Sequence, residues 1–317
     1  MRADAVSRRP RAGRIVSARY PEHLRAEVEA YLQGMTFSEE PLTAGLEDAM
    51  RYSLLAGGKR IRPVLALASA DAVGVRRDEV LPLAAALELI HTYSLIHDDL
   101  PAMDDDELRR GQPTCHVKFG EGVAILAGDG LYAEAFSHLL THQRSSPERV
   151  LAAAAELAAA TGASGMVGGQ YADISDGEAA GQGGPESLRR LHELKTGRLI
   201  SASVLCVLLL TGTADGPEAT PFRRFAAELG VLFQIVDDIL DVTGTDDALG
   251  KPRGSDERHG KRTYVSEFGI DRARQLAAES HSTARAALAE LADRGSVKEG
   301  ATGELEDIAD FIYRRTS

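Results

Sequence analysis

The chain of 317 residues contains no tryptophan and only two cysteines, and aromatic residues make up 5% of it. Segments rich in valine, isoleucine and tyrosine between turn pairs, which indicate strands, are scarce. We therefore predict an all-α fold with a core of aliphatic and small side chains. The cysteines, Cys115 and Cys206, lie far apart without metal-ligand spacing. This argues against a disulfide framework and favours location of the protein in the reducing cytoplasm.

Acidic residues outnumber basic residues, and the formal net charge is −12 at pH 7. A protein that binds a nucleic acid polymer needs a basic stripe to neutralise phosphates, and none is present. The same balance argues against an anionic membrane surface. Small phosphorylated ligands are not excluded, because local lysines and arginines outweigh total charge at short range.

Long hydrophobic runs are missing as well. The longest, LISASVLCVLLL from Leu199, is too short to span a bilayer and predicts a core helix instead. Residues 1–18 are basic without an apolar signal core, so we expect a disordered tail. No later change of composition marks a domain boundary and no fixed-period repeat is evident. Residues 19–317 therefore predict one domain of ten or more helices.

An acidic cluster follows one of the predicted helices. The stretch LIHDDLPAMDDDELRRGQPT, residues 95–114, places six acids within ten residues, directly after an apolar pattern with helical spacing. Four residues, including Pro101, separate Asp98 and Asp99 from Asp104. Because proline disfavours a continued helix, we expect a loop that returns Asp104 to the side of Asp98.

A second acidic group lies in FQIVDDILDVTGTDDALGK, residues 233–251. Asp237 and Asp241 are four residues apart and share a helix face, whereas Asp238 is rotated by about 100°. Either group alone is typical of a solvated helix end. Two such groups without histidine or cysteine offer hard oxygen ligands, which suit Mg²⁺ and not Zn²⁺. The spacing required for an EF-hand is absent.

Basic residues accompany both acidic groups. Guanidinium and ammonium groups are what a diphosphate needs on the faces that a metal leaves open. Singly, each is typical of a protein surface; together they favour diphosphate binding. These residues are Lys59, Arg60, Arg62, Arg109, Arg110, Lys195, Arg198, Lys251 and Lys261. His91, on the helix before Asp98, is either a core residue or a donor to phosphate.

The motifs occur in the order GGKRIRP, HDDLPAMDDDELRRGQPT, GGQYAD, KTG, FQIVDDILD, GKPRGSD and GKRTY. In this the chain resembles the trans-isoprenyl diphosphate synthases, most closely the bacterial short-chain branch that includes farnesyl diphosphate synthase. The resemblance runs from about Pro21 to Arg315. It implies an all-α homodimer with helices around a deep central cavity, and three Mg²⁺ ions between the two Asp motifs.

The resemblance also implies roles for individual residues. Metal binding is implied for Asp98, Asp99, Asp104, Asp237 and Asp241, with Asp238 and Asp241 as weaker or water-mediated partners. Binding of the allylic diphosphate is implied for Arg109, Lys195, Thr196, Gln234, Lys251 and Lys261. Binding of isopentenyl diphosphate is implied for Lys59, Arg62, His91 and Arg110. The main catalytic groups would be Asp98, Asp104, Arg109, Lys195 and Asp237, supported by Gln170 and Asp173.

The chemistry expected of such a site needs no nucleophilic serine or cysteine. Metal and cations stabilise charge on a departing diphosphate, the allylic carbocation forms, and the double bond of isopentenyl diphosphate attacks it. A terpene cyclase would not need the second diphosphate pocket. A non-catalytic partner subunit would be expected to lose one Asp motif, and a phosphohydrolase would need a covalent-Asp motif after a strand.

Tyr93 bears on product length. It lies five residues before Asp98, about 7–8 Å along the helix, where a ring could close the cavity beside the small Ser94. This pattern resembles farnesyl synthases, and we expect farnesyl diphosphate, with geranylgeranyl diphosphate as the alternative. Tyr93 could instead merely fill the core.

Overall fold

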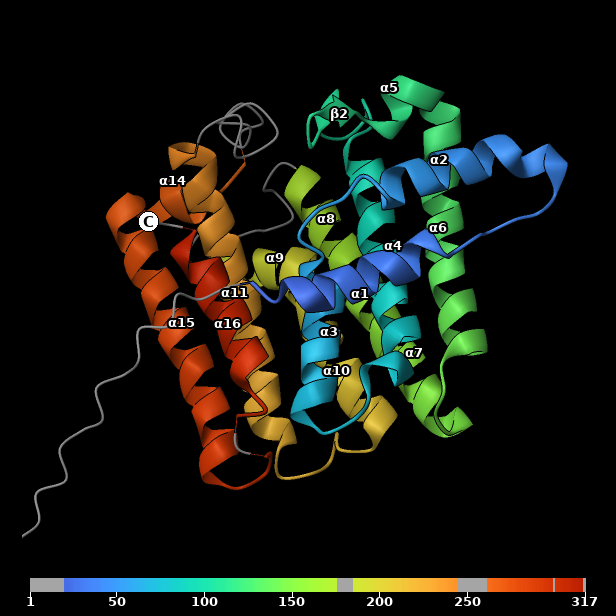
Figure 1. Cartoon of the computed structure of the whole chain (residues 1–317). Helices are drawn as coiled ribbons and strands as arrows, with labels where there is room; N and C mark the ends of the chain where they lie inside the picture. Colours follow the sequence, from blue (N-terminus) through green and yellow to red (C-terminus); the bar gives the residue numbers. More distant parts are fainter. Residues whose placement is uncertain (1–19, 176–184, 245–260, 299, 316–317) are drawn as a thin grey trace, which may run out of the picture.

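The computed structural model describes residues 20–175, 185–244, 261–298 and 300–315, so the expected tail at residues 1–18 and Lys251 lie outside it. The described chain is almost entirely helical, which confirms the all-α prediction (Figure 1). The helices are α1 (Glu22–Gln33), η1 (Pro41–Thr43), α2 (Ala44–Leu54), α3 (Ile61–Ala72), η2 (Arg77–Glu79), α4 (Leu81–Asp98), α5 (Cys115–Phe119), α6 (Glu121–His142), α7 (Pro147–Thr161), α8 (Met166–Ile174), α9 (Pro185–His192), the π-helix η3 (Glu193–Gly197), α10 (Arg198–Thr211), α11 (Ala219–Thr243), α14 (Tyr264–Phe268), α15 (Ile270–Asp293) and α16 (Gly303–Arg314). One two-stranded hairpin, β1 (Leu108–Arg109) with β2 (Gln112–Pro113), interrupts the helices.

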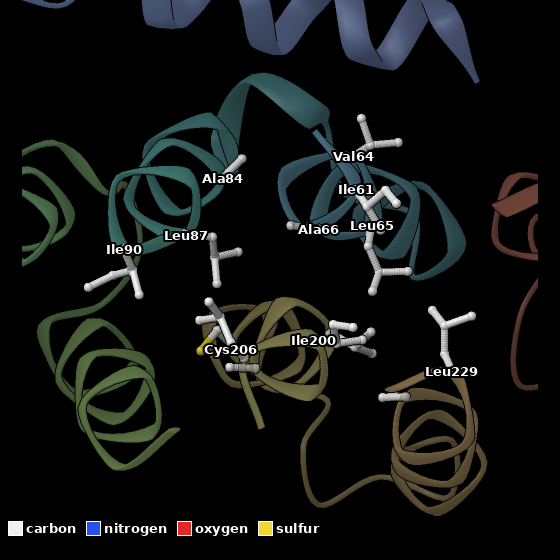
Figure 2. Packing of buried hydrophobic residues seen from close by; sticks show 14 of the residues in the cluster. Ile61, Val64, Leu65, Ala66, Ala84, Leu87, Ile90, Ile200, Cys206 and Leu229 are labelled. Carbon is white, nitrogen blue, oxygen red and sulfur yellow. The ribbon is translucent and has the colours of Figure 1, made fainter. Parts of the chain in front are cut away.

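The core is built around α10, which packs against α3, α7 and α11. Figure 2 shows Ile200 and Cys206 of α10 facing Leu65 of α3 and Leu87 of α4. All four side chains are almost completely buried. Burying each such side chain contributes about 1.5–3 kcal/mol, so the apolar run at Leu199 works as a core helix.

The helices around this core form two sides. On one side α11 packs on α15, and α15 on α16; on the other, α4 packs on α6, and α6 on α2. Figure 1 shows α6 and α15 near opposite edges of the bundle. The cavity described below lies between elements of the two sides, with α4 and α11 both contributing to its wall.

Two stretches, Pro147–Ile174 and Glu186–Thr211, are long and apolar enough by length and composition to cross a membrane. In their most apolar windows 39% and 61% of the residues are buried inside the fold. A turn divides the first into α7 and α8, and η3 interrupts the second. Both are accounted for as packed helices of the bundle, which favours the prediction that no segment spans a membrane.

Candidate active site

The first acidic group sits where α4 ends. The helix stops at Asp98, and the backbone N–H of Asp104 then donates to the carbonyl of Asp98 at 2.9 Å. The N–H of Asp105 donates to the carbonyl of Leu100 at 3.1 Å. Pro101 cannot continue the helix, and the chain folds back on itself. The predicted return of Asp104 to Asp98 is confirmed.

The β1–β2 hairpin carries Arg109 and Arg110, which follow the first acidic group in sequence. Its two turn residues, Arg110 and Gly111, have φ of 55° and 74°, as a two-residue turn between twisted strands requires. Arg109 binds Asp99, with Nε and Nη2 2.8 and 2.5 Å from Oδ1. Arg110 instead donates to the carbonyl of Gly57, so neighbouring arginines serve different parts of the site.

The second acidic group lies on α11. Asp237 is exposed on its helix, whereas Asp238 is 1% exposed. The carboxylate of Asp238 accepts hydrogen bonds from Gln234 Nε2 and the backbone N–H of Tyr264, both at 2.7 Å. Asp241 is also buried. The expected rotation of Asp238 away from Asp237 therefore separates an accessible carboxylate from a structural one.

The KTG motif forms the π-helix η3, a geometry often found at functional sites. Glycines allow neighbouring helices to reach it: a Cβ at Gly169 of α8 would lie 2.3 Å from the backbone nitrogen of Lys195. Thr196 Oγ1 donates to Gln234 Oε1 at 3.1 Å, and Lys195 pairs with Asp173. Close backbone contact thus brings three helices together at this motif.

These elements surround one cavity of about 550 Å³. Asp98 and Asp237, remote in sequence, both line it. The predicted site residues on its wall are Arg62, His91, Tyr93, Ser94, Asp98, Asp104, Arg109, Arg110, Lys195, Thr196, Gln234, Asp237 and Lys261, together with Gln170, Asp173 and Asp238. The structure thus brings most of the sequence-based candidates to a single place.

Three candidates stand off this wall. Asp99 is 3% exposed and its carboxylate accepts a hydrogen bond from Arg109, and Asp241 is 5% exposed. Lys59 is exposed, with its Nζ 5.3 Å from the ring centroid of Phe311 in α16. Their ligand-binding roles stay predictions.

Charge is concentrated around the cavity. Burial raises the pKa of Asp98 to about 6, opposed by Lys195 and reinforced by the charge of Asp104. Burial lowers the pKa of Arg62 to about 10, still well above neutral pH. Burial and the nearby arginines also lower the pKa of His91, which keeps its imidazole neutral. Lys261 Nζ lies 2.9 Å from both oxygens of Asp104 and so places a positive charge beside the first acidic group.

His192 is a cavity residue that the sequence interpretation missed. It is 6% exposed, lines the cavity, and stacks on Tyr264 with centroids 5.4 Å apart. Neither ring nitrogen has a hydrogen-bond partner within the described residues, and Asp238 Oδ2 lies 3.9 Å away. Burial lowers its pKa to about 4, so the ring is neutral. Its position one helical turn before Lys195 is the signal that could have identified it.

Comparison with known proteins decides the family. The sequence profile of polyprenyl synthetases matches residues 43–299. The chain belongs to the polyprenyl synthetase family. It is 43% identical to the farnesyl diphosphate synthase of Escherichia coli over 304 residues, which covers 93% of this chain and 99% of that one. It is therefore a trans-prenyltransferase.

Plant relatives are similar over a shorter region. The heterodimeric geranylgeranyl pyrophosphate synthase large subunit 1 of Arabidopsis thaliana is 48% identical over 250 residues, 78% of this chain and 67% of its own. The geranylgeranyl pyrophosphate synthase of Capsicum annuum is 47% identical, with 76% of this chain and 65% of its own covered. The chain thus spans about two thirds of these relatives.

Solved structures show the same fold. The geranyltransferase of Helicobacter pylori, complexed with magnesium and isoprenyl diphosphate, superposes with a TM-score of 0.82 at 31% identity. The alignment covers 92% of this chain and 96% of that one. A geranyltransferase from Legionella pneumophila gives 0.79 at 33% identity, covering 93% and 96% of the two chains.

Proposed function

We propose that this protein condenses isopentenyl diphosphate with an allylic diphosphate, dimethylallyl or geranyl, in a Mg²⁺-dependent reaction that ends at farnesyl diphosphate. The observation that carries the proposal is the shared cavity, which has carboxylates of both Asp groups on its wall together with two sets of cations. One set, Arg62 and Arg110, adjoins the neutral His91. The other, Lys195 and Lys261, adjoins the carboxylates.

The donor set fits magnesium. The acidic groups on the cavity wall offer only oxygen ligands, and burial of Asp98 makes its negative charge costly without a cation. Within the described residues no three histidine, cysteine or acidic side chains converge on one point. Mg²⁺ is commonly held by one or two carboxylates, with substrate phosphate oxygens and water completing the shell. Asp98 and Asp104 would provide ligands from the first acidic group and Asp237 from the second, and the metal would neutralise charge on the diphosphate bound between them.

The protein's own groups do the remaining work. Lys195 and Lys261 provide ammonium groups for the charge that develops on the departing allylic diphosphate. Arg62 and Arg110, with His91 as a neutral donor, hold isopentenyl diphosphate so that its double bond faces the allylic carbon. The allylic C–O bond breaks first, the double bond of isopentenyl diphosphate then attacks the carbocation to form the new C–C bond, and the proton lost afterwards passes to the released diphosphate.

The apolar end of the cavity bears on product length. Tyr93 lines the cavity and is 7% exposed, and its ring meets Tyr132 of α6 edge-on, with centroids 5.0 Å apart. Phe136 lies behind Tyr132, with centroids 5.3 Å apart. The floor is therefore backed by a second aromatic layer. This favours farnesyl diphosphate over the geranylgeranyl product that the names of the plant relatives suggest.

Tyr93→Ala tests the floor. Removing the ring should lengthen the main product to geranylgeranyl diphosphate, because the cavity gains room for about one further isoprene unit. Products are dephosphorylated, extracted and identified by mass spectrometry. Tyr31→Ala is the matched control, since Tyr31 of α1 bonds His138 and does not line the cavity. Unchanged chain length in Tyr93→Ala would assign the ring to core packing alone.

Incubation of the pure protein with isopentenyl diphosphate and each primer, with and without Mg²⁺, tests the activity itself. Condensed products only in the presence of Mg²⁺ are expected. A cyclised hydrocarbon from an allylic diphosphate alone would favour a terpene cyclase, and absence of product with every primer would favour a silent partner subunit.

We also propose a homodimer that associates through the outer face of α6. Ile125, Leu126 and Leu140 of this edge helix are exposed by 44%, 58% and 49%. Light scattering should give twice the chain mass, and Leu126→Glu should shift it toward the monomer.

The expected cytoplasmic location stays a prediction, since the names of several plant relatives place them in chloroplasts.

A further inference from the structure

Arg60 stands between Lys59 and Arg62 in GGKRIRP, yet it does not line the cavity. Its side chain is 3% exposed and turns into the protein. Nη1 donates to Glu88 Oε1 of α4 at 2.6 Å, and Nε donates to Glu29 Oε1 of α1 at 2.8 Å. Nη2 donates to the carbonyl of Leu54, at the end of α2, at 2.7 Å. This arginine therefore ties three helices to the basic motif.

The backbone at Arg60 explains why such ties are needed. Its φ of 54° and ψ of 39° are left-handed, which is uncommon and unfavourable for a residue with a side chain. Arg60 is also the N-cap of α3, so its conformation sets the direction in which α3 carries Arg62 into the site. The buried contacts of its guanidinium group hold this turn.

The same turn seats the hairpin arginine. A Cβ at Gly58, whose φ is 125°, would lie 2.6 Å from the Cζ of Arg110. The guanidinium group of Arg110 thus rests directly on the glycine backbone and donates to the carbonyl of Gly57. Lys59 is held on the other side, where its carbonyl accepts from the hydroxyl of Tyr20. Three cations of the basic motif and hairpin therefore depend on one short segment.

Glu88 supplies the negative charge beneath these cations. It is 1% exposed and lies one turn before His91 on α4. Burial lowers the pKa of both Arg62 and Arg110, and the charge of Glu88 acts against this in each case. One oxygen of Glu88 accepts from Arg60, and the other has no hydrogen-bond partner within the described residues. The charge of Glu88 therefore offsets part of the repulsion among these arginines.

We propose that Arg60 and Glu88 are positioning residues for isopentenyl diphosphate, holding Lys59, Arg62 and Arg110 in one arrangement without touching the substrate. The inference rests on the proposed function. It predicts a selective defect, because the hydrogen bonds of the pair within the described residues go to Glu29 and Leu54 and to each other, beside the basic pocket and not beside Lys195 or Asp237.

Glu88→Gln tests this, since it keeps the shape and removes the charge. We expect the KM for isopentenyl diphosphate to rise about tenfold, while the KM for geranyl diphosphate and kcat stay within about twofold. Arg60→Lys keeps the charge but cannot reach all three acceptors, and should show the same split. Glu88→Asp, which keeps the carboxylate, should recover most of the affinity.

Glu27→Gln and Arg77→Lys are matched controls. Arg77 Nη1 donates to Glu27 Oε1 of α1 at 2.7 Å, away from the cavity. Both KM values should be unchanged in these variants. If Glu88→Gln does not fold, Arg60→Lys tests the positioning role in the same way, by a rise in the KM for isopentenyl diphosphate alone.

A lower Tm with an unchanged KM for isopentenyl diphosphate, or an equal rise in both KM values, would overturn the positioning role. Wild-type protein that forms no condensed product would instead refute the proposed function, whatever the variants do. The two failures are therefore distinguishable.

Discussion

The two adjacent aspartate pairs, Asp98–Asp99 and Asp237–Asp238, look alike in sequence but divide their work in the same unexpected way. Asp98, Asp237 and Asp238 all line the cavity, but the second member of each pair is almost fully buried, with Asp99 3% and Asp238 1% exposed. Asp99 holds the charged guanidinium group of Arg109, whereas Asp238 is held by two uncharged donors. Each pair thus combines one carboxylate available to ligands with one that organises the surrounding chain.

The difference between the inner partners matters as much as the similarity. Arg109 retains some solvent access, with 30% of its side chain exposed, and Asp106 lies 3.7 Å from it. The backbone N–H of Tyr264, one of the donors to Asp238, has no such access, because it lies in a buried environment. The position of an aspartate within its pair therefore decides whether it is available to ligands or organises the chain. The kind of hydrogen-bond partner decides how much the stability of the fold depends on the inner aspartate.

The largest effect should come from the outer carboxylates. Asp98→Asn and Asp237→Asn should each lower kcat/KM about 10²–10³-fold, because each removes a charge that faces the diphosphate and its metal. Asp99→Asn and Asp238→Asn should lower it by less than about tenfold. Steady-state kinetics at saturating Mg²⁺ measures both. An equal loss of kcat/KM for both members of either pair would contradict the assignment of different roles to the two aspartates.

The next effect should fall on stability. Asp238→Asn puts an amide where a carboxylate accepts from two donors, which leaves a buried donor unsatisfied at a cost of about 2–3 kcal/mol. The Tm should drop by about 3–5 °C. Asp99→Asn should cost about 1 kcal/mol, because Arg109 can turn to water and Asp106.

Thermal unfolding followed by circular dichroism, in the absence of Mg²⁺, gives the comparison. Asp237→Asn is the control for Asp238→Asn, since the same substitution at an exposed neighbour should leave Tm within about 1 °C. A larger loss for Asp99→Asn than for Asp238→Asn would reverse the ranking of partners.

Local rules of chain geometry made much of this site predictable. Pro101 disfavours continuation of the helix that ends at Asp98, so the return of Asp104 to Asp98 followed from sequence. The helical repeat likewise separated Asp237 from Asp238. Apolar content was enough to predict the burial of α10, and motif order was enough to predict the family.

Contacts between remote segments were beyond such rules. Nothing near GGKRIRP indicates that Arg60 would meet Glu29 and Glu88, 31 and 28 residues away, while its neighbours turn to the site. The pairing of Asp99 with Arg109 depends on the hairpin, whose turn residue Arg110 adopts a conformation that sequence assigns to glycine or asparagine. Where several like residues stand together, tertiary packing decides which of them faces the ligand.

The last effect concerns the free-energy cost of keeping Asp98 ionised in the folded protein. Burial raises its pKa to about 6 from 3.8 in the unfolded chain, so the folded protein binds this proton more tightly. Stability should therefore fall as pH rises from about 4 through 6 and then level off. Asp98→Asn removes the ionisation and should be more stable than wild type by about 3 kcal/mol at pH 8, with the difference vanishing near pH 4.

Tm measured between pH 4 and 8 without Mg²⁺ checks this, with Asp237→Asn as the exposed comparison. Mg²⁺ and diphosphate together should close the gap, because ligand binding stabilises only the wild-type site. A variant less stable than wild type at every pH would mean that Asp98 supports the fold. It would then resemble Asp99 and Asp238, and the distinction between outer and inner carboxylates would fail at its first member.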